Sequence, residues 1–414
     1  MIRLKLLLAM CLFAVQAWSQ STRGTILGNV TDASGAAVPA AEVVVTNQGT
    51  NVSVKTTTGN DGQYTVTNLD PGTYRVSVGA QGFKSSTVQD VILQVSQTVR
   101  QNVQVTVGDL ASSVSVEATA PVVQSDTSSI ASVVDNRQIQ TIPLNGRSNI
   151  NSLLTIAPGV MKTGQNPIIS GGVWFGSTNM TVDGVSNIDT GNERLSPLTP
   201  SLEAIGEFRV ISNGASAEFG RGGAQVVVAT REGTNTLHGS LFAFNRNAAL
   251  SAKNFFATGL PKPPFNRNEF GGSLGGHIIK DKLFYFGSFE GLRLRQSITN
   301  VFALPTAALK GGNFAGLGAI RDPTTNAPFL NNVIPPGRIN TVATQLLKYS
   351  PDVNQPGTGA AGLGNNYVYN SPTRESNDRY SARADYNLTS KDRLTGRWFQ
   401  AKDGPFLSGQ GTGT

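Results

Sequence analysis

The stretch YSARADYNL, residues 380–388, changes from apolar to polar side chains at every step. Successive side chains of a β-strand point to opposite faces, so Tyr380 and Leu388 share one face with the apolar residues between them. Arg383 and Asp385 then lie on the other face. An apolar face with aromatic ends, opposite a charged face, is typical of a strand between lipid and a watery interior. The stretch therefore predicts a transmembrane barrel strand; a soluble sheet with one wet face is the alternative.

The neighbouring residues continue this pattern. After a tight turn at 389–392, Leu394, Gly396 and Trp398 alternate with polar residues, which predicts the partner strand. A second hairpin is predicted to run along 270–279, to turn at 280–282 and to return along 283–294. The Gly-, Pro- and Asn-rich segment 303–375 is expected to be a long extracellular loop, and the short turns are expected to face the periplasm.

The number of strands falls short of a closed barrel. A transporter barrel of about 22 strands needs several hundred residues, whereas 236–414 has room for roughly five to seven strands. An open sheet cannot lie in lipid with unpaired edges. We therefore expect these residues to be the first strands of an incomplete antiparallel barrel, encoded by a truncated reading frame or present as a fragment.

Composition favours an exported, mainly β protein. The charge of +7 is spread over 414 residues without a basic run, only 14% of residues are charged, and 46 are glycine. A clustered basic stripe, which nucleic-acid-binding proteins usually show, is missing from the sequence. Arg3 and Lys5 followed by the apolar run 6–15 and the small residues of Ala-Trp-Ser predict a signal peptide at 1–19, cleaved before Gln20; an uncleaved anchor is the alternative. Cys11 is the only cysteine, so no disulfide is expected.

Residues 24–107 are predicted to form a β-sandwich. Turn-forming clusters at 32–35, 59–62 and 70–72 separate short alternating segments. The expected strands are 25–31, 41–47, 52–58, 63–68, 73–79 and 98–107. The quoted residues GNVTDASGAAVPAAEVVVTN (28–47), TTTGNDGQYTVTNLDPGTYRVSV (56–78) and GFKS (82–85) resemble the carboxypeptidase regulatory-like domain. This resemblance implies a transthyretin-like, carbohydrate-binding-like sandwich without catalytic residues.

Residues 108–124 look like an extended linker, and 125–232 like a small α+β unit. The pattern predicts a short helix from near Ser148 to before Pro158, and a strand that turns at Asp183-Gly184. Ser201 is expected to cap a turn that leads into a strand. A further strand is expected around 224–230.

Residues SLEAIGEFRVISNGASAEFGRGGAQVVVATREGTNTLHGSLFAF (201–244) resemble the end of the plug and the barrel entry of TonB-dependent outer-membrane receptors. The segments IPLNGRS (142–148) and NMTVDGVSNID (179–189) resemble the Oar-like branch of these receptors. The resemblance implies a plug domain at 125–232, a barrel from 236 and a place in the outer membrane. It also implies that substrate binds plug and barrel loops and that a TonB-type energy-transducing protein shifts the plug, without cofactor or covalent chemistry.

Two sets of residues are predicted to carry this function. The TonB contact is expected where an extended segment can pair its backbone with a partner sheet; the alternative is a plain linker strand. Its residues are Ser113, Val114, Ser115, Val116, Glu117, Ala118 and Thr119. The second set consists of plug-motif residues, expected to hold plug to barrel rather than to touch substrate: Asn145, Arg147, Asn179, Asp183 and Arg221.

Motifs for enzymatic chemistry are weak. Gly271-Gly-Ser-Leu-Gly275 matches the hydrolase elbow pattern, but Ser273 lies within an alternating strand rather than before a helix. His238 and His277 are too few for a zinc peptidase site and lack acidic partners at suitable spacing. Gly220-Arg-Gly-Gly223 precedes a strand, which argues against a phosphate loop and favours a tight turn. No catalytic, cofactor or metal residues are predicted.

The leading hypothesis is thus a TonB-dependent receptor or transporter component for uptake or export of a siderophore, glycan or peptide. The second hypothesis is a glycan-binding or adhesive module that acts through the sandwich alone. A third, hydrolytic hypothesis would need activity that is lost on Ser273→Ala. The strand alternation at 380–388 favours the first.

Overall fold

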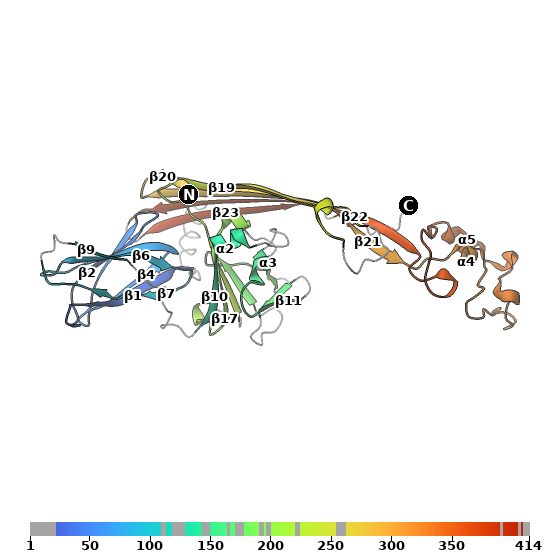
Figure 1. The fold of residues 1–414 in the computed structure, drawn as a ribbon, viewed down its shortest axis with the longest axis horizontal. Helices are drawn as coiled ribbons and strands as arrows, with labels where there is room; N and C mark the ends of the chain where they lie inside the picture. The colour runs from blue at the N-terminus through green and yellow to red at the C-terminus, as the bar shows by residue number, and fades with distance from the viewer. Residues whose placement is uncertain are drawn as a thin grey trace, which may run out of the picture. The chain divides into compact units, whose positions relative to one another are not determined.

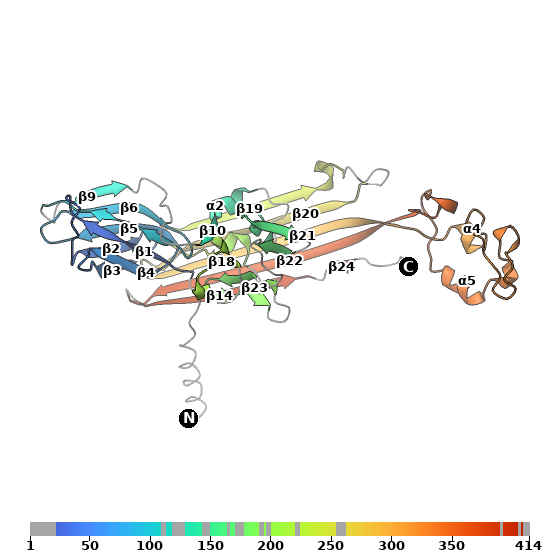
Figure 2. The ribbon, with the colours of Figure 1, turned by 90° about the horizontal axis from the view of Figure 1, so that it is seen from below.

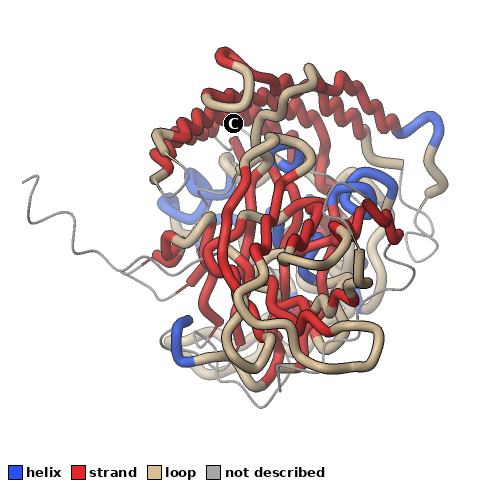
Figure 3. Tube along the Cα trace, turned by 90° about the vertical axis from the view of Figure 1, so that its left-hand side faces the viewer, coloured by secondary structure: helices blue, strands red, loops and turns tan. Residues whose placement is uncertain are grey.

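A computed structural model describes residues 22–108, 113–117, 129–142, 150–163, 166–169, 178–189, 194–195, 200–219, 224–253, 262–389, 392–404 and 407–408. The predicted signal peptide, residues 1–19, lies outside them. The chain forms two compact units: Met1–Phe242, Phe270–Glu290 and Asp378–Lys402 make the first, and Ala243–Glu269, Gly291–Asn377 and Asp403–Thr414 the second. Strands dominate the described chain, as expected for a mainly β protein (Figure 3).

The N-terminal strands form the predicted sandwich (Figure 1). One sheet has the order β3-β2-β5-β6-β9; the other has the order β4-β1-β7, and β8 also pairs with β1. The bounds are Gly24–Thr31 (β1), Glu42–Asn47 (β2), Ser53–Thr57 (β3), Gln63–Leu69 (β4), Gly72–Gly79 (β5), Ser85–Leu93 (β6), Thr98–Arg100 (β7), Val103–Gln104 (β8) and Ser113–Glu117 (β9). Alternate residues of both sheets, among them Ile26, Val45 and Val76, fill one core.

Strand β6 was not predicted, and the last predicted strand, 98–107, is wrong in part. In β6 the left-handed Asp90 (φ 57°) shifts the register against β5, so its apolar residues are not evenly spaced. The segment 98–107 divides into β7 and β8. The division falls where the Gln101 amide donates to Leu27 O (2.7 Å) and the Asn102 side chain accepts from the Asn29 amide (2.9 Å).

A second sheet, here called the plug sheet, lies within the predicted plug segment. Its order is β10-β17-β18-β13-β14, and only the β13–β18 pair in it is parallel. The bounds are Ile130–Asp135 (β10), Thr178–Val182 (β13), Val185–Ser186 (β14), Ile205–Asn213 (β17) and Ala224–Thr230 (β18). Every residue of β18 is buried, as in a strand covered on both faces. The predicted turn after β13 is confirmed: Asp183 and Gly184 have φ of 49° and 84°, which a two-residue hairpin requires.

Short hairpins and helices complete this segment. The hairpins pair Val160–Thr163 (β11) with Asn166–Ile169 (β12), and Ile188–Asp189 (β15) with Arg194–Leu195 (β16). Helix α2 (Asn136–Thr141) begins with a capping box formed by Asp135 and Gln138. Helix α3 (Ile150–Leu154) ends before Pro158 as predicted, and its expected start at Ser148 lies outside the described residues.

Ser201 occupies the N-cap position of a short turn, as predicted. The turn η2 (Leu202–Ala204) follows this residue, but the Ser201 side chain makes no cap hydrogen bond. Its hydroxyl instead lies 2.9 Å from that of Ser288 on the strand Leu283–Phe302 (β21). The tertiary contact thus outweighs the local one. The second short turn, η3 (Ala217–Phe219), precedes β18.

A third sheet, here called the wall sheet, has the order β19-β20-β21-β22-β23, with β24 pairing with β22. The bounds are His238–Asn247 (β19), Phe265–Ile279 (β20), Leu283–Phe302 (β21), Tyr367–Asn387 (β22), Arg393–Asp403 (β23) and Leu407–Ser408 (β24). Both predicted hairpins are present in this antiparallel, unclosed sheet (Figure 2).

The alternation that predicted the wall strands is confirmed in the first unit. On β22, Asp385 is 0% exposed and Tyr386 37% exposed, and Leu388, directly after the strand, is 55% exposed. On β23, Leu394 and Trp398 are likewise exposed. Aromatic rings line this exposed side: the Phe289 and Tyr380 rings lie 5.1 Å apart. On β22 and β23, polar residues therefore face the covered side and apolar residues the open side, the reverse of a soluble sheet. On β21 the covered side is mixed, because Phe284 and Phe286 are buried there beside Ser288 and Glu290.

In the second unit, β22 begins at Tyr367, so the predicted loop 303–375 is too long. Asn370-Ser371-Pro372 has turn chemistry, but Ser371 is buried and the Asn370 side chain accepts from Thr299 on β21 (2.8 Å). Residues 303–366 carry short helices and turns at Ala307–Lys310 (α4), Leu330–Asn332 (η5), Pro336–Arg338 (η6), Thr341–Leu347 (α5) and Ala360–Gly362 (η7), and η4 (Ala248–Leu250) follows β19. Within the described residues, no helix combines the length and apolar character needed to cross a bilayer.

The plug sheet depends on Phe208, which is 0% exposed in its core. We expect Phe208→Ala to destabilise this sheet by about 3–5 kcal/mol, because the lost ring leaves a cavity. Hydrogen exchange of the β17 and β18 amides measures this change. Val185→Ala, at a position 58% exposed, is the control and should stay within about 0.5 kcal/mol. Equal exchange in the two variants would contradict the assigned core.

Candidate functional site: a buried charge cluster

The plug sheet presents two carboxylates at the end of its central strands. Asp183 lies in the β13–β14 turn, and Thr230 at the end of β18 donates to it through its amide (2.8 Å) and its hydroxyl (2.6 Å). Glu232 follows two residues after Thr230. The parallel pairing of β13 and β18 brings these residues to the same sheet edge. Asp183 is thereby held in one orientation.

The wall sheet presents arginines on its polar side. Arg383 on β22, and Arg393 and Arg397 on β23, all belong to the faces that the alternation predicts to be polar. Asp385 anchors them: it lies 2.8 Å from Arg383 Nε and 3.0 Å from Arg393 Nη2. The Thr395 hydroxyl donates to the same carboxylate at 2.8 Å. Two neighbouring strands thus share one buried acid.

Ion pairs connect the two sheets. Arg397 Nη1 lies 2.7 Å from the Asp183 carboxylate, and Arg393 Nη2 lies 2.7 Å from that of Glu232. Arg383 donates to the Thr230 carbonyl (2.9 Å) and to Glu232 (3.3 Å). Charge-assisted hydrogen bonds of this kind are the strong ones in proteins.

The sandwich adds a further carboxylate. Asp70, in the turn between β4 and β5, pairs with Arg393 and with Arg23 (3.2 Å). The Tyr74 hydroxyl donates to the Asp70 carbonyl (2.6 Å) and fixes the turn. Residues from all three β-layers of the first unit therefore meet in one cluster.

Charges in the cluster are matched in number. Four arginines face four carboxylates: Arg23, Arg383, Arg393 and Arg397 against Asp70, Asp183, Glu232 and Asp385. Burial raises the pKa of Glu232, an effect that Arg393 and Arg383 oppose. A buried pair contributes little net stability when intact, but removal of one partner leaves an uncompensated charge at high cost. The cluster is therefore suited to a contact in which the ion pairs are either all formed or all broken.

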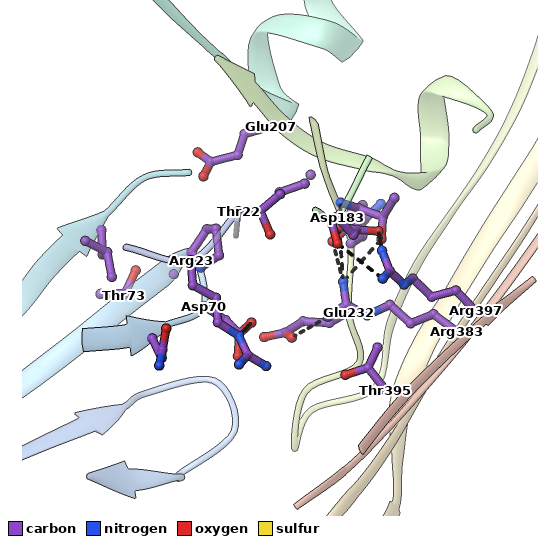
Figure 4. A pocket seen from close by; sticks show the side chains of 18 of the residues that line it. Thr22, Arg23, Asp70, Thr73, Asp183, Glu207, Glu232, Arg383, Thr395 and Arg397 are labelled. Atoms are coloured by element: carbon purple, nitrogen blue, oxygen red, sulfur yellow. Dashed lines mark hydrogen bonds and ion pairs between the residues drawn. The ribbon is translucent and has the colours of Figure 1, made fainter. Parts of the chain in front are cut away.

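A cavity of about 600 Å³ adjoins the cluster (Figure 4). Arg23 and Asp70 line it from the sandwich, Glu207 and Glu232 from the plug segment, and Arg397 from the wall. In Figure 4, dashed lines join Asp183 to Arg383 and Arg397, and Glu232 to Arg383. The cavity lining is mixed, with charged side chains beside apolar ones such as Ile92 and Leu93. In the described part of the chain, no group of three or more His, Cys, Asp or Glu residues is arranged to hold a metal ion.

Two residues of the predicted plug motif are described. Asp183 belongs to the cluster, whereas Asn179 is buried elsewhere and donates to the Phe219 carbonyl (3.1 Å). Asn145, Arg147 and Arg221 lie outside the described residues. In the predicted TonB contact, Ser113–Glu117 forms β9, which pairs in parallel with β6 from Ser85↔Ser113 to Gln89↔Glu117. Ala118 and Thr119 are not described.

The sequence pattern missed Asp70, Thr230 and Glu232 as members of the site. The need for such acidic residues is predictable, because arginines on the polar face of a barrel strand require counter-charges. Nothing in the local pattern points to the plug turns that supply them. Ser273, the candidate hydrolase serine, lies within the continuous strand β20, where its hydroxyl contacts Ser240 (2.8 Å) and Arg231 (3.3 Å).

Two family models match the chain. The carboxypeptidase regulatory-like domain matches residues 25–106, and the outer membrane beta barrel domain matches 229–413. Together with the sandwich, the plug sheet and the lipid-type alternation of the wall sheet, they define the class: an outer-membrane β-barrel protein with an N-terminal regulatory-like sandwich.

A curated relative makes the class specific. The TonB-dependent transporter Oar of Myxococcus xanthus is 30% identical over 296 residues, which are 67% of this chain and 27% of the relative. The chain is thus a homologue of the Oar-type TonB-dependent receptors and spans about a quarter of the length of this relative.

Two solved receptor structures are also similar. The siderophore receptor PirA of Acinetobacter baumannii is 19% identical, with 67% of this chain and 32% of that chain covered and a TM-score of 0.39. The ferric enterobactin receptor PfeA of Pseudomonas aeruginosa, as the mutant R480A, is 15% identical, with 66% and 33% covered and a TM-score of 0.38.

Glu232→Gln tests the cluster. This change removes the charge that Arg383 and Arg393 share, and we expect it to destabilise the plug sheet by up to about 3 kcal/mol, since breaking a buried pair leaves charges uncompensated. Hydrogen exchange of the β18 amides measures the loss. Glu42→Gln, in the exposed Glu42–Lys55 pair (2.7 Å), is the matched control and should cost less than about 1 kcal/mol. Equal effects of the two changes would mean that the cluster does not hold the plug sheet.

Proposed function

We propose that this chain carries the gate of a TonB-dependent outer-membrane transporter. In this proposal the plug is held against the barrel wall by the charge cluster, and transport requires the cluster to break. The observation that carries the proposal is the set of ion pairs from Asp183 and Glu232 to Arg397, Arg393 and Arg383. Homology to the transporter Oar supports it.

The properties of the cluster fit a gate. All of its charges are paired, so the closed arrangement has no buried charge without a counter-charge. Displacement of one plug carboxylate leaves wall arginines without their counter-charge. Water or a ligand must then compensate the charge of these arginines. A pull of a few ångströms on the plug would thereby convert a balanced cluster into a polar, water-accessible path.

The proposed location is the outer membrane. The exposed apolar side chains of β22 and β23, such as Leu394 and Trp398, suit contact with lipid. The ligand is proposed to be a siderophore, glycan or peptide bound from outside, and either uptake or export is compatible with the gate. No covalent chemistry is required of the chain, because a gate acts by displacement. No cofactor is proposed.

The proposed partner is a TonB-type energy-transducing protein that pairs with residues 113–119. Strand β9 is the last strand of its sheet, so one of its backbone edges faces away from β6. Such an edge can accept a further strand by backbone hydrogen bonds, which require little of the side chains. The linker after β9 leads directly to β10, the edge strand of the plug sheet.

Cross-linking tests the partner. We expect Ser115→Cys, in a Cys11→Ser background, to form a disulfide with a cysteine in the C-terminal domain of the TonB-type protein from the same organism. Non-reducing electrophoresis detects the product. Ser34→Cys, in the exposed turn after β1, is the control and should give none. Equal cross-linking at both positions would argue against a specific contact.

Membrane insertion tests the transporter role itself. In a chimera, residues 24–404 of this chain replace the matched part of Oar. The rest of Oar supplies the remaining barrel strands. We expect the chimera to fractionate with outer membranes and to require detergent for extraction. A soluble chimera that binds sugars would overturn the proposal in favour of the glycan-binding module.

A further inference from the structure

The sandwich contacts the plug sheet at a second place, away from the charge cluster. The turn Gln94–Gln97 joins β6 to β7 and is internally fixed: the Gln94 amide donates to its partner Gln97 Oε1 (2.8 Å), and the Ser96 amide donates to the Thr22 carbonyl (3.0 Å). Ser96 has a φ of 50°, in the left-handed region that residues other than glycine rarely adopt. The turn is therefore a preformed, rigid projection.

Val95 at the tip of this turn is completely buried, but not in the sandwich core. It packs with Ile211, Phe219, Val227 and Ala229 of the plug segment in a small separate cluster. An apolar side chain at a turn tip is normally exposed. Its burial here removes apolar surface from water on both partners and favours the contact.

Polar groups on β17 hold the backbone of the same turn. Arg209, which is 2% exposed, donates through Nη1 to the Ser96 carbonyl (2.8 Å) and lies 3.5 Å from that of Val95. Glu207 accepts a hydrogen bond from the Val95 amide. Glu207, Arg209 and Ile211 alternate along β17, so one face of the strand carries all three contacts.

Glu207 occupies an unfavourable position for a negative charge. Its Oε1 is buried and has no hydrogen-bond partner in the described part of the chain. Burial raises its pKa to about 7, and Asp135 at the end of β10 adds to this, while the Val95 amide and Arg209 oppose it. Glu218 in η3 also acts on Arg209, and Arg23, Arg231 and Glu232 face the adjoining cavity.

We propose that the Gln94–Gln97 turn is a docking element that the plug sheet holds through Glu207 and Arg209, and that ionisation of Glu207 releases this turn and so loosens the sandwich. Undocking returns Glu207 to water, where its pKa is near its ordinary value of 4.5. The docked state therefore binds more protons between pH 4.5 and 7. Docking is strongest below that range and weakens as pH rises through it. The contact does not depend on the transport role.

The Gln94–Gln97 turn and the plug strand β17 both belong to the first unit, so the contact lies within one compact unit. Undocking would expose Ile211, Phe219 and Val227 on the plug sheet. The interface thus gives the regulatory-like sandwich a role that requires no sugar. It senses protonation and changes how firmly the plug segment is held.

Distance measurements on the full chain in detergent test the proposal. Spin labels at Ser34→Cys on the sandwich and Val185→Cys on the plug sheet, both exposed, are combined with Cys11→Ser. We expect one narrow distance distribution at pH 5 and a broad one at pH 8, since the docking constant falls by up to roughly 100-fold over this shift. Identical distributions at both pH values would overturn the proposal.

Variants separate the proton effect from folding. Glu207→Gln keeps an acceptor for the Val95 amide without the charge, and we expect a narrow distribution at both pH values. Arg209→Met removes the bond to Ser96 and should broaden the distribution even at pH 5. Glu42→Gln, far from this turn on β2, should behave like the native chain. A Glu207→Gln variant that still broadens at pH 8 would assign the effect to another group and contradict the proposal.

Discussion

Arginines on a buried face need carboxylates, and this requirement connects the layers of the first unit. Arg383, Arg393 and Arg397 lie on the covered side of strands whose other side is apolar, so they cannot turn outward. Asp385 compensates part of their charge, and it is completely buried between them. The remaining charge has to be met from outside the sheet. Asp183, Glu232 and Asp70 meet it, which means that the plug turns and one sandwich turn must be present for the wall to be electrically balanced.

The wall strands β22 and β23 could be predicted because one physical rule governs their residues in the first unit. A strand with lipid on one side and polar groups on the other must alternate, and the burial of 380–388 follows the sequence at each position. The sandwich was predictable for a related reason: its turns contain Asp, Asn, Gly and Pro at the places where the chain reverses. Strand β6 escaped prediction because the left-handed Asp90 breaks the alternation on which the prediction depends.

The site was far less predictable than the fold. Asp183 was predicted from a motif. Glu232 lies in the Gly-containing segment directly after β18, whose sequence is typical of a surface loop. Asp70 is a typical turn residue, and its turn chemistry alone explains its presence. Their roles arise from contacts between residues more than 150 positions apart, such as Glu232 with Arg383 and Arg393. Single-sequence patterns describe local chemistry and faces of strands, and they carry no information about which faces meet.

The two anchors of the sandwich differ in what they can sense. Asp70 pairs with arginines, which keep their positive charge at any physiological pH, so that anchor depends on the pairing of fixed charges. Glu207 meets a backbone amide and a single arginine in a poorly solvated place, so its charge state can change near neutrality. Both groups line the same cavity. Ionisation of Glu207 adds a negative charge there, close to a cluster whose charges are otherwise matched. The sandwich can therefore loosen at the Glu207 contact while Asp70 still holds it. Full release of the sandwich requires the charge cluster to break as well.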